Sequence, residues 1–516
     1  MLFVALVAAT PRSPFPPVLP QGMEPGGPFR WLSDLLGMHR LDESGLMLVG
    51  LASTISAAIG FILLAREAFA GRLSMRTAIW LAVAYHVAVL FLPLLFSRDV
   101  YSYAYYGRIV STYGANPYVD TPRDFPLNSL FPLTWPGWRD TPSVYGPLFT
   151  WISAGITWST KGLQATITGF QLLAAAASLG TIAVLARVVT RVKPERAVFA
   201  VAMVGLNPIV IFHVVGGGHN DMLVAFFVTV AAAFVLADRH LVAAVMLGLG
   251  LSVKASAVVP LVLLMVVVVA MAPPARRRSM LVTYVGVVGG VWLVLALPFL
   301  QTTNPTLGLV EVSGHDSWMA PGQVVVRVFG GAGALIAGHG GREVAAQLAR
   351  LLLFGVSATG VVVVARRLWR DPSSRTAVAL LAAWGWAFLL VILPSPVLFT
   401  WYLVWTLPLA WALPRVARRS IVVLSGFFVV TQLVTESGRL PELLAGVRIP
   451  FGHPIALAVC VWIAVDLIRR MRAGTPLDAE TGRPEFGDAF EAGGMVVEST
   501  PAAIGAAPVR ALRRRR

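Results

Sequence analysis

Apolar runs close to twenty residues long recur along most of the chain and constrain its fold more than any other feature. About twenty consecutive apolar residues are needed for a helix to cross a bilayer, so these runs predict membrane-spanning helices. Only 13% of the residues are charged, whereas soluble domains carry about 25%. The sequence therefore predicts an all-α polytopic protein of the cell membrane. The runs lie near 45–65, 77–96, 164–188, 197–214, 221–237, 241–272, 279–300, 345–365, 376–394, 399–414, 420–436 and 453–468.

Basic residues predict how these helices are oriented. The net charge is +16, but the arginines gather at the ends of apolar runs, as in cytoplasmic loops, which argues against nucleic-acid binding. Alternating passes place every basic cluster in the cytoplasm under two conditions. The run at 147–158 must not cross, and 241–272 must be a hairpin of two short helices meeting near Lys254. This predicts about 13 passes, or 14 with a short N-terminal apolar stub, and a cytoplasmic C-terminus.

Two long polar loops then fall on the extracytoplasmic side. They span residues 97–163 and 301–344, within a membrane domain predicted over 1–472. Residues 473–516 are rich in Gly, Ala, Pro and acids and end in four arginines, which predicts a disordered cytoplasmic tail able to touch anionic lipid. The polar motifs gather in the outer loops, so we expect an extracytoplasmic active site.

The first outer loop begins with FSRDVYSYAYYGR, residues 96–108. Asp99 lies where a helix leaves the bilayer, and an acid close to hydrocarbon is costly and usually functional. If the helix continues, Asp99 shares a face with Tyr103 and Tyr106. An aromatic belt at the lipid headgroups is the alternative interpretation of the tyrosines.

Shorter outer loops carry further polar groups. GGGHNDM offers the side chains of His219, Asn220 and Asp221 together. A glycine-rich turn with Asn220 or Asp221 as the N-cap of the next helix is the alternative. Lys254 lies inside a long apolar run, at the expected hairpin apex, where a compact ammonium suits a phosphate.

Two more motifs complete the candidate site. VSGHDSW places His315 and Asp316 in the second outer loop. FTWYLVW contains Trp401 and Tyr402, which either line a lipid or sugar groove or belong to an interfacial belt, the interpretation we take for Trp405. A lone histidine beside one acid does not have metal-ligand spacing, so we predict no metal site and no cofactor, although the sequence leaves a divalent metal open.

These motifs give the chain a resemblance to a known family. FSRDVYSYAYYGRIVSTYGANPY, YGPLF, GGGHNDML, LSVKASAVVPL and FTWYLVW resemble the GT-C superfamily of polyprenol-phosphate-sugar-dependent glycosyltransferases. Within it, the chain resembles the actinobacterial α-(1→6)-mannopyranosyltransferases that use polyprenol-phosphate-mannose to build lipomannan and lipoarabinomannan cores. The chain departs from their pattern in its very short segment before residue 10 and in lacking a proline soon after Lys254.

The resemblance implies a GT-C-like helix bundle and an inverting mannosyltransferase with one Asp base, which Asp99 matches. The base would deprotonate an acceptor hydroxyl, and a phosphate leaving group held by fixed charge needs no protonating acid. The partners implied are a polyprenol-phosphate-sugar donor and a mannan or lipid-anchored glycan acceptor. We expect the donor phosphate to contact Lys254, Arg98 and Arg108. We expect the sugar or acceptor to contact Tyr103, Tyr106, His219, Asn220, Asp221, His315, Asp316, Trp401 and Tyr402.

Two alternatives stay open. One is a glycosyltransferase with another lipid-linked sugar or linkage, such as an arabinofuranosyl or α-(1→2)-mannosyl transferase. The other is a flippase or transporter of lipid-linked sugars. Transporters place charges at the bilayer midplane on broken helices, whereas the polar motifs here gather at one membrane face, which favours an enzyme.

Overall fold

The structure is a computed structural model that describes residues 2–10, 13–17, 29–300, 320–436 and 442–479. Within these ranges the chain is helical without a β-strand, which confirms the all-α prediction. Among the described helices, five are long and apolar enough to cross a membrane. The chain is therefore a multi-pass membrane protein, while the count of 13 or 14 passes stays a prediction. The five are Glu43–Phe69, Leu163–Val192, Pro194–Val215, Pro274–Phe299 and Pro321–Arg370.

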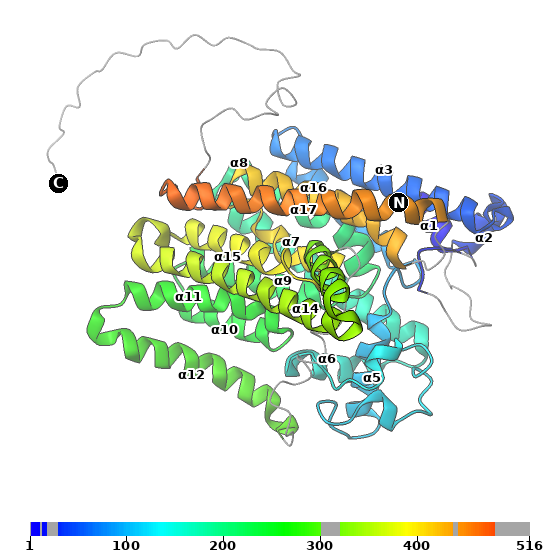
Figure 1. Ribbon diagram of the computed structural model, residues 1–516, viewed down its shortest axis with the longest axis horizontal. Helices are drawn as coiled ribbons and strands as arrows, with labels where there is room; N and C mark the ends of the chain where they lie inside the picture. Colours follow the sequence, from blue (N-terminus) through cyan, green and yellow to red (C-terminus); the bar gives the residue numbers. More distant parts are fainter. Residues whose placement is uncertain (1, 11–12, 18–28, 301–319, 437–441, 480–516) are drawn as a thin grey trace, which may run out of the picture. The chain divides into compact units, whose positions relative to one another are not determined.

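Most of the predicted runs form helices with similar bounds (Figure 1). Short polar side chains set several starts: Asp42 accepts a hydrogen bond from Gly45 N–H before α3, and Ser74 and Thr376 cap α4 and α15 in the same way. Such caps satisfy amides that the first turn leaves without a partner. The helices are α3 (Glu43–Phe69), α4 (Met75–Val89), α7 (Leu163–Val192), α8 (Pro194–Gly205) with a π-helix (Ile209–Val215), α9 (Asp221–Leu236), α12 (Arg277–Ala296), α15 (Ala377–Ile392), α16 (Arg415–Glu436) and α17 (Glu442–Arg472).

The 241–272 run is broken near Lys254, as its basic flanks required. Helices α10 (His240–Leu251) and α11 (Val258–Met271) pack against each other, with a 3-10 turn at Ala255–Ala257 between them. They have 12 and 14 residues, fewer than the roughly 20 needed to span a bilayer. The polar apex of this pair is therefore held inside the helix bundle.

The prediction of a spanning helix at 399–414 is wrong. Thr400–Trp405 and Leu407–Leu409 form 3-10 turns, and every side chain from 400 to 414 except Tyr402 is buried. This run is apolar because protein surrounds it, and apolar composition alone does not separate burial in protein from burial in lipid.

The second long loop, predicted at 301–344, is helical from residue 321 onward. Helix α14 (Pro321–Arg370) has a kink at Ala337 and Gly338, where Gly338 has a φ of 63°. The two halves approach closely, since a Cβ on Gly333 would lie 2.2 Å from the Gly341 carbonyl oxygen. The glycines of this stretch thus permit tight helix packing. His315 and Asp316 lie outside the described residues.

The first loop is an ordered lobe, which we call the 97–163 lobe. Helices α5 (Asp99–Ser111) and α6 (Pro147–Ser159) lie side by side in it (Figure 1). A Cβ on Gly107 would lie 2.4 Å from the Ser153 carbonyl oxygen, so only glycine allows this approach. The Tyr105 hydroxyl donates to the Phe125 carbonyl and the Tyr106 hydroxyl to the Thr141 carbonyl, which ties the connecting segment to α5.

Both ends of the described chain pack on the bundle. The N-terminal stub forms α1 (Leu2–Ala8), which contacts α3. At the other end, Leu477 is buried and its carbonyl accepts a hydrogen bond from Trp386 Nε1 at 3.2 Å. Arg367 donates to the Gly474 carbonyl at 2.8 Å. Residues 473–479, predicted as the start of the tail, are therefore folded, and 480–516 lie outside the described residues.

Candidate active site

Asp99 is the first residue of α5. Its backbone N–H donates to Ser97 Oγ at 3.2 Å. Its carboxylate is 24% exposed, and Oδ2 lies 3.6 Å from Nδ1 of His219. The acid thus sits at a helix start in the 97–163 lobe, open enough to meet a substrate and close to a second polar group.

The surroundings of Asp99 prepare it to take up a proton near neutral pH. Burial raises the pKa of Asp99 to about 6, although the Lys254 ammonium opposes this rise. A general base works best when its pKa lies close to the operating pH. The raised pKa keeps the carboxylate mostly ionised at pH 7 while making it more basic than an ordinary aspartate.

His219 reaches Asp99 because of the glycine-rich turn before it. The Gly216 carbonyl accepts hydrogen bonds from Leu95 N–H at 3.1 Å and from Gln171 Nε2 at 2.9 Å. Gly218 has a φ of 64°, and a Cβ there would lie 2.6 Å from Val100 Cγ2. Only glycine satisfies both demands, so the turn holds His219 against the first turn of α5.

The His219 ring is enclosed on several sides. It stacks on Trp401 with ring centroids 3.9 Å apart, and Nδ1 lies 3.3 Å from the Tyr103 hydroxyl. Burial lowers the pKa of His219 well below its usual value, so the imidazole is neutral. Within the described chain, Nε2 of His219 and both amide atoms of Asn220 are buried without a hydrogen-bond partner. Buried polar atoms are normally paired, so these atoms have hydrogen-bonding capacity that the described chain leaves unused.

Lys254 forms a buried ion pair with Asp221. Its Nζ lies 2.8 Å and 3.1 Å from the two carboxylate oxygens, and Trp405 Nε1 donates to the same carboxylate at 2.9 Å. Asp221 is fully buried, while the Lys254 side chain is 18% exposed. The ammonium also lies 4.5 Å from the centre of the Tyr402 ring, a cation–π contact.

The YGPLF motif explains how the 97–163 lobe is joined to this ion pair. Gly146 N–H donates to the Val253 carbonyl at 2.9 Å, and Leu148 N–H donates to the Ser252 carbonyl at 2.8 Å. Carbonyl groups of the α10–α11 connection thus accept hydrogen bonds from backbone amides at the start of α6, which have no partner within their own helix. A Cβ on Gly146 would lie 2.3 Å from the Ser252 carbonyl oxygen, so glycine is required at this joint.

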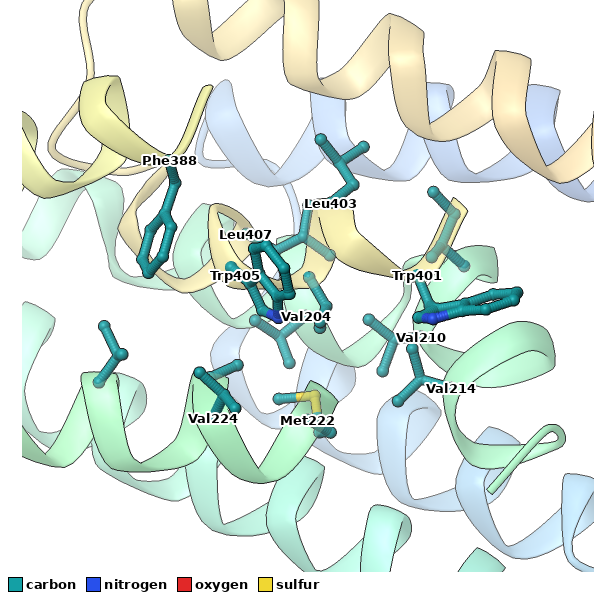
Figure 2. Close-up of a cluster of buried hydrophobic side chains, with 14 of the residues drawn as sticks. Val204, Val210, Val214, Met222, Val224, Phe388, Trp401, Leu403, Trp405 and Leu407 are labelled. Carbon is teal, nitrogen blue, oxygen red and sulfur yellow. The ribbon is translucent and has the colours of Figure 1, made fainter. Parts of the chain in front are cut away.

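The structure brings most of the predicted site residues into one cluster. Tyr103, Trp401 and Tyr402 contact His219 or Lys254 as described above. Figure 2 shows Trp401 and Trp405 among the buried apolar side chains that include Val210 and Met222. The predicted site residues that the structure brings together are Asp99, Tyr103, His219, Asn220, Asp221, Lys254, Trp401 and Tyr402.

Other predicted residues have different surroundings. Arg108 donates from Nη1 to Asn128 Oδ1 at 2.9 Å and to Ser129 Oγ at 3.0 Å, so it braces the 97–163 lobe. Tyr106 is buried and also bonds within the lobe. Arg98 is partly exposed directly before Asp99. No group of three or more His, Cys, Asp or Glu side chains in the described part could hold a metal ion.

Trp405 is a site residue that the sequence interpretation missed. We assigned it to an interfacial belt, but its side chain is buried and hydrogen-bonds Asp221. Its place in FTWYLVW was the only signal for it, because indole rings serve both as belt residues and as buried donors.

Comparisons with known proteins agree with the motifs. Residues 23–272 match the family model described as Alpha-(1->6)-mannopyranosyltransferase, N-terminal domain. Alpha-(1->6)-mannopyranosyltransferase A of Mycobacterium tuberculosis is 26% identical over 409 residues, which cover 75% of this chain and 74% of that protein. The protein of the same name from Corynebacterium glutamicum is 31% identical over 34% of this chain and 35% of its own length. A probable alpha-(1->6)-mannopyranosyltransferase of Mycolicibacterium smegmatis is 32% identical over 29% of this chain and 27% of its own. No solved structure matches the chain.

Proposed function

We propose that this chain, a membrane glycosyltransferase that resembles the actinobacterial α-(1→6)-mannopyranosyltransferases, transfers mannose from polyprenol-phosphate-mannose to a growing α-(1→6)-mannan. The acceptor would be the core of lipomannan or lipoarabinomannan, and the reaction would take place on the outer face of the membrane. The observation that carries the proposal is the partly exposed Asp99 carboxylate beside neutral His219.

The reaction needs one base. Asp99 takes the proton from the acceptor hydroxyl as the oxygen attacks the anomeric carbon of mannose. The bond from that carbon to the phosphate oxygen breaks on the opposite face, and its electrons leave with the polyprenyl phosphate. A single displacement of this kind inverts the anomeric configuration. His219 Nε2 and the Asn220 amide, buried and without a partner in the described chain, would hold hydroxyls of the sugar.

The phosphate contact is proposed for Lys254 and Arg98. An ammonium has three N–H donors, and Lys254 directs its Nζ to two oxygens of Asp221. The side chain is still 18% exposed, so an anion could approach the ammonium from its exposed side. The positive charge near the leaving group would stabilise the phosphate that is released.

An apolar groove supports a lipid-linked donor. It has a volume of about 420 Å³ and lies between α1, α3, α4 and the π-helix. Val49, Ala57 and Leu64 line it along α3, and Ile211 and Phe212 line it where the chain leads toward His219. An isoprenoid chain in this groove would bury apolar surface next to the segment that carries the site.

The test is a transfer assay in membranes. Radiolabelled polyprenol-phosphate-mannose and short α-mannosides serve as substrates, and linkage analysis identifies the product. Asp99→Asn should lower kcat by about 100- to 10,000-fold, the usual range for a general base. Asp140→Asn is the matched control, because Asp140 is an exposed carboxylate of the same lobe that pairs with Arg123. Both variants are checked for folding by thermal unfolding.

Several outcomes would contradict the proposal. Near-normal transfer by Asp99→Asn would remove Asp99 as the base and make Asp316 the next candidate. A product with another linkage, or transfer only from a lipid-linked arabinose, would favour the related glycosyltransferases. Movement of the donor across sealed liposomes without a glycosidic product would indicate a transporter.

A further inference from the structure

A strained turn comes directly before the candidate base. Phe96 has a φ of 63°, and Ser97 N–H donates to the Leu95 carbonyl at 2.7 Å, which makes residues 95–97 a γ-turn. Turns of this left-handed kind are rare and strained, and a bulky residue at positive φ is a genuine outlier. Such strain persists only where neighbouring structure enforces it, and it concentrates at functional sites.

The N-terminal segment enforces the turn from one side. Phe96 N–H donates to the Phe15 carbonyl at 2.6 Å, and the two rings meet edge to face with centroids 5.4 Å apart. Both side chains are buried, at 0% and 2% exposure. A segment at the start of the chain therefore supplies both a hydrogen bond and an aromatic contact to a residue three positions before Asp99.

The π-helix enforces the turn from the other side. The Phe96 ring stacks on His213 with centroids 4.3 Å apart, and Leu95 N–H donates to the Gly216 carbonyl. Next along the same two segments, Asp99 meets His219. Residues 95–99 are thus joined to residues 213–219 by three contacts: Leu95 with Gly216, Phe96 with His213, and Asp99 with His219. The γ-turn therefore sets the direction from which Asp99 approaches His219.

We propose that Phe15 and Phe96 are positioning residues for glycosyl transfer, which hold the γ-turn so that the Asp99 carboxylate faces His219 and the acceptor. The proposal rests on the proposed role of Asp99 as the base. It gives a catalytic purpose to the N-terminal segment, because Phe15 lies before the region, residues 23–272, that matches the family model. Phe15 touches neither substrate nor reacting atoms and acts through Asp99.

The test compares Phe15→Ala with Phe91→Ala in full-length protein. Phe91 is a matched control, because it is 54% exposed and five positions before Phe96. Misplacing a catalytic group by about 1 Å can cost about 100-fold in rate, so Phe15→Ala should lower kcat per folded enzyme about 10- to 100-fold. The donor KM should stay unchanged, since the phosphate and sugar contacts are not altered. Phe15→Leu keeps apolar bulk and should lose less activity than Phe15→Ala.

The Asp99→Asn background separates positioning from a general structural role. Residual transfer by Asp99→Asn should not fall further when Phe15→Ala is added, because the base is already lost. An equal fall in both backgrounds, or a kcat per folded enzyme within twofold of wild type for both Phe15 variants, overturns the inference. If Phe15→Ala does not fold, Phe15→Leu is compared in the same two backgrounds. Full activity of Asp99→Asn alone would instead overturn the proposed function, so the two failures are distinguishable.

Discussion

Replacing Lys254 with methionine tests how much of the fold depends on the buried ion pair. The Asp221 carboxylate is 0% exposed and receives Nζ of Lys254 at 2.8 Å and 3.1 Å. Methionine keeps an unbranched, flexible side chain but removes the charge. Of its two side-chain donors, the carboxylate would then keep Trp405 Nε1–H and lose the charged one. Removing one partner of a buried pair costs about 3–5 kcal/mol, so the free energy of unfolding should fall by that amount.

A double variant isolates the cause. Adding Asp221→Asn removes the uncompensated charge and leaves an amide that still accepts from Trp405. The double variant should therefore recover most of the stability lost by Lys254→Met. Unfolding is followed in detergent by tryptophan fluorescence, in parallel for wild type, both single variants and the double variant. The coupling energy of this cycle is the quantity that measures the pair.

The same variants decide whether Lys254 also serves the donor. A hydrogen bond to a charged group contributes about 1.5–3 kcal/mol, and about 1.4 kcal/mol is tenfold. Lys254→Met and the double variant should therefore both lose about 10- to 100-fold in kcat/KM for the donor. A double variant with restored stability and wild-type donor kinetics would refute the phosphate contact. A loss of stability below about 1 kcal/mol in Lys254→Met would refute the claim that the pair is buried and structural.

Two further predictions concern the 97–163 lobe. Burial raises the pKa of Asp99 in the free enzyme to about 6, so the base is protonated as the pH falls through 6. The value of kcat/KM, which reports ionisation of the free enzyme, should therefore decrease below pH 6 with a slope of one proton. An acidic limb near pH 4 in the measured pH–rate profile would contradict this. Arg108→Gln should leave the donor KM unchanged, because its guanidinium bonds Asn128 and Ser129. It should instead speed limited proteolysis of the lobe, and a tenfold rise in donor KM would place Arg108 in the phosphate site after all.

The sequence predicted the helical membrane fold well because apolar length is a direct physical requirement of the bilayer. The broken run at Lys254 followed from charge alone, since both flanks are basic. Prediction from apolar length failed at 399–414. An apolar sequence shows that the side chains avoid water, but it does not show whether lipid or protein surrounds them. The prediction failed again at 321–344, because a stretch less apolar than a membrane span can still form a helix, here one whose halves pack closely at Gly333 and Gly341.

The site was predictable as a set of residues but not as a set of contacts. Asp99, His219 and Lys254 stand out because polar groups beside apolar runs are costly. Their pairing is not encoded locally, since Asp221 meets Trp405 across 184 positions and Tyr103 meets His219 across 116. Arg108 shows the same limit: a guanidinium in a loop serves an anion or the loop itself, and the folded lobe determines which.

The contacts that Trp401 and Trp405 make with His219 and Asp221 also determine when the site is completed during synthesis of the chain. Apart from Tyr402, the other groups of the site lie between residues 99 and 254, yet His219 has its stacking partner and Asp221 its indole donor only once residue 405 is in place. About 400 of the 516 residues must therefore leave the ribosome and enter the membrane first. A nascent chain can carry the base and the lysine for many seconds, at about 5–20 residues per second, without a closed site. The two tryptophans thus make the site one of the last parts of the described chain to be completed.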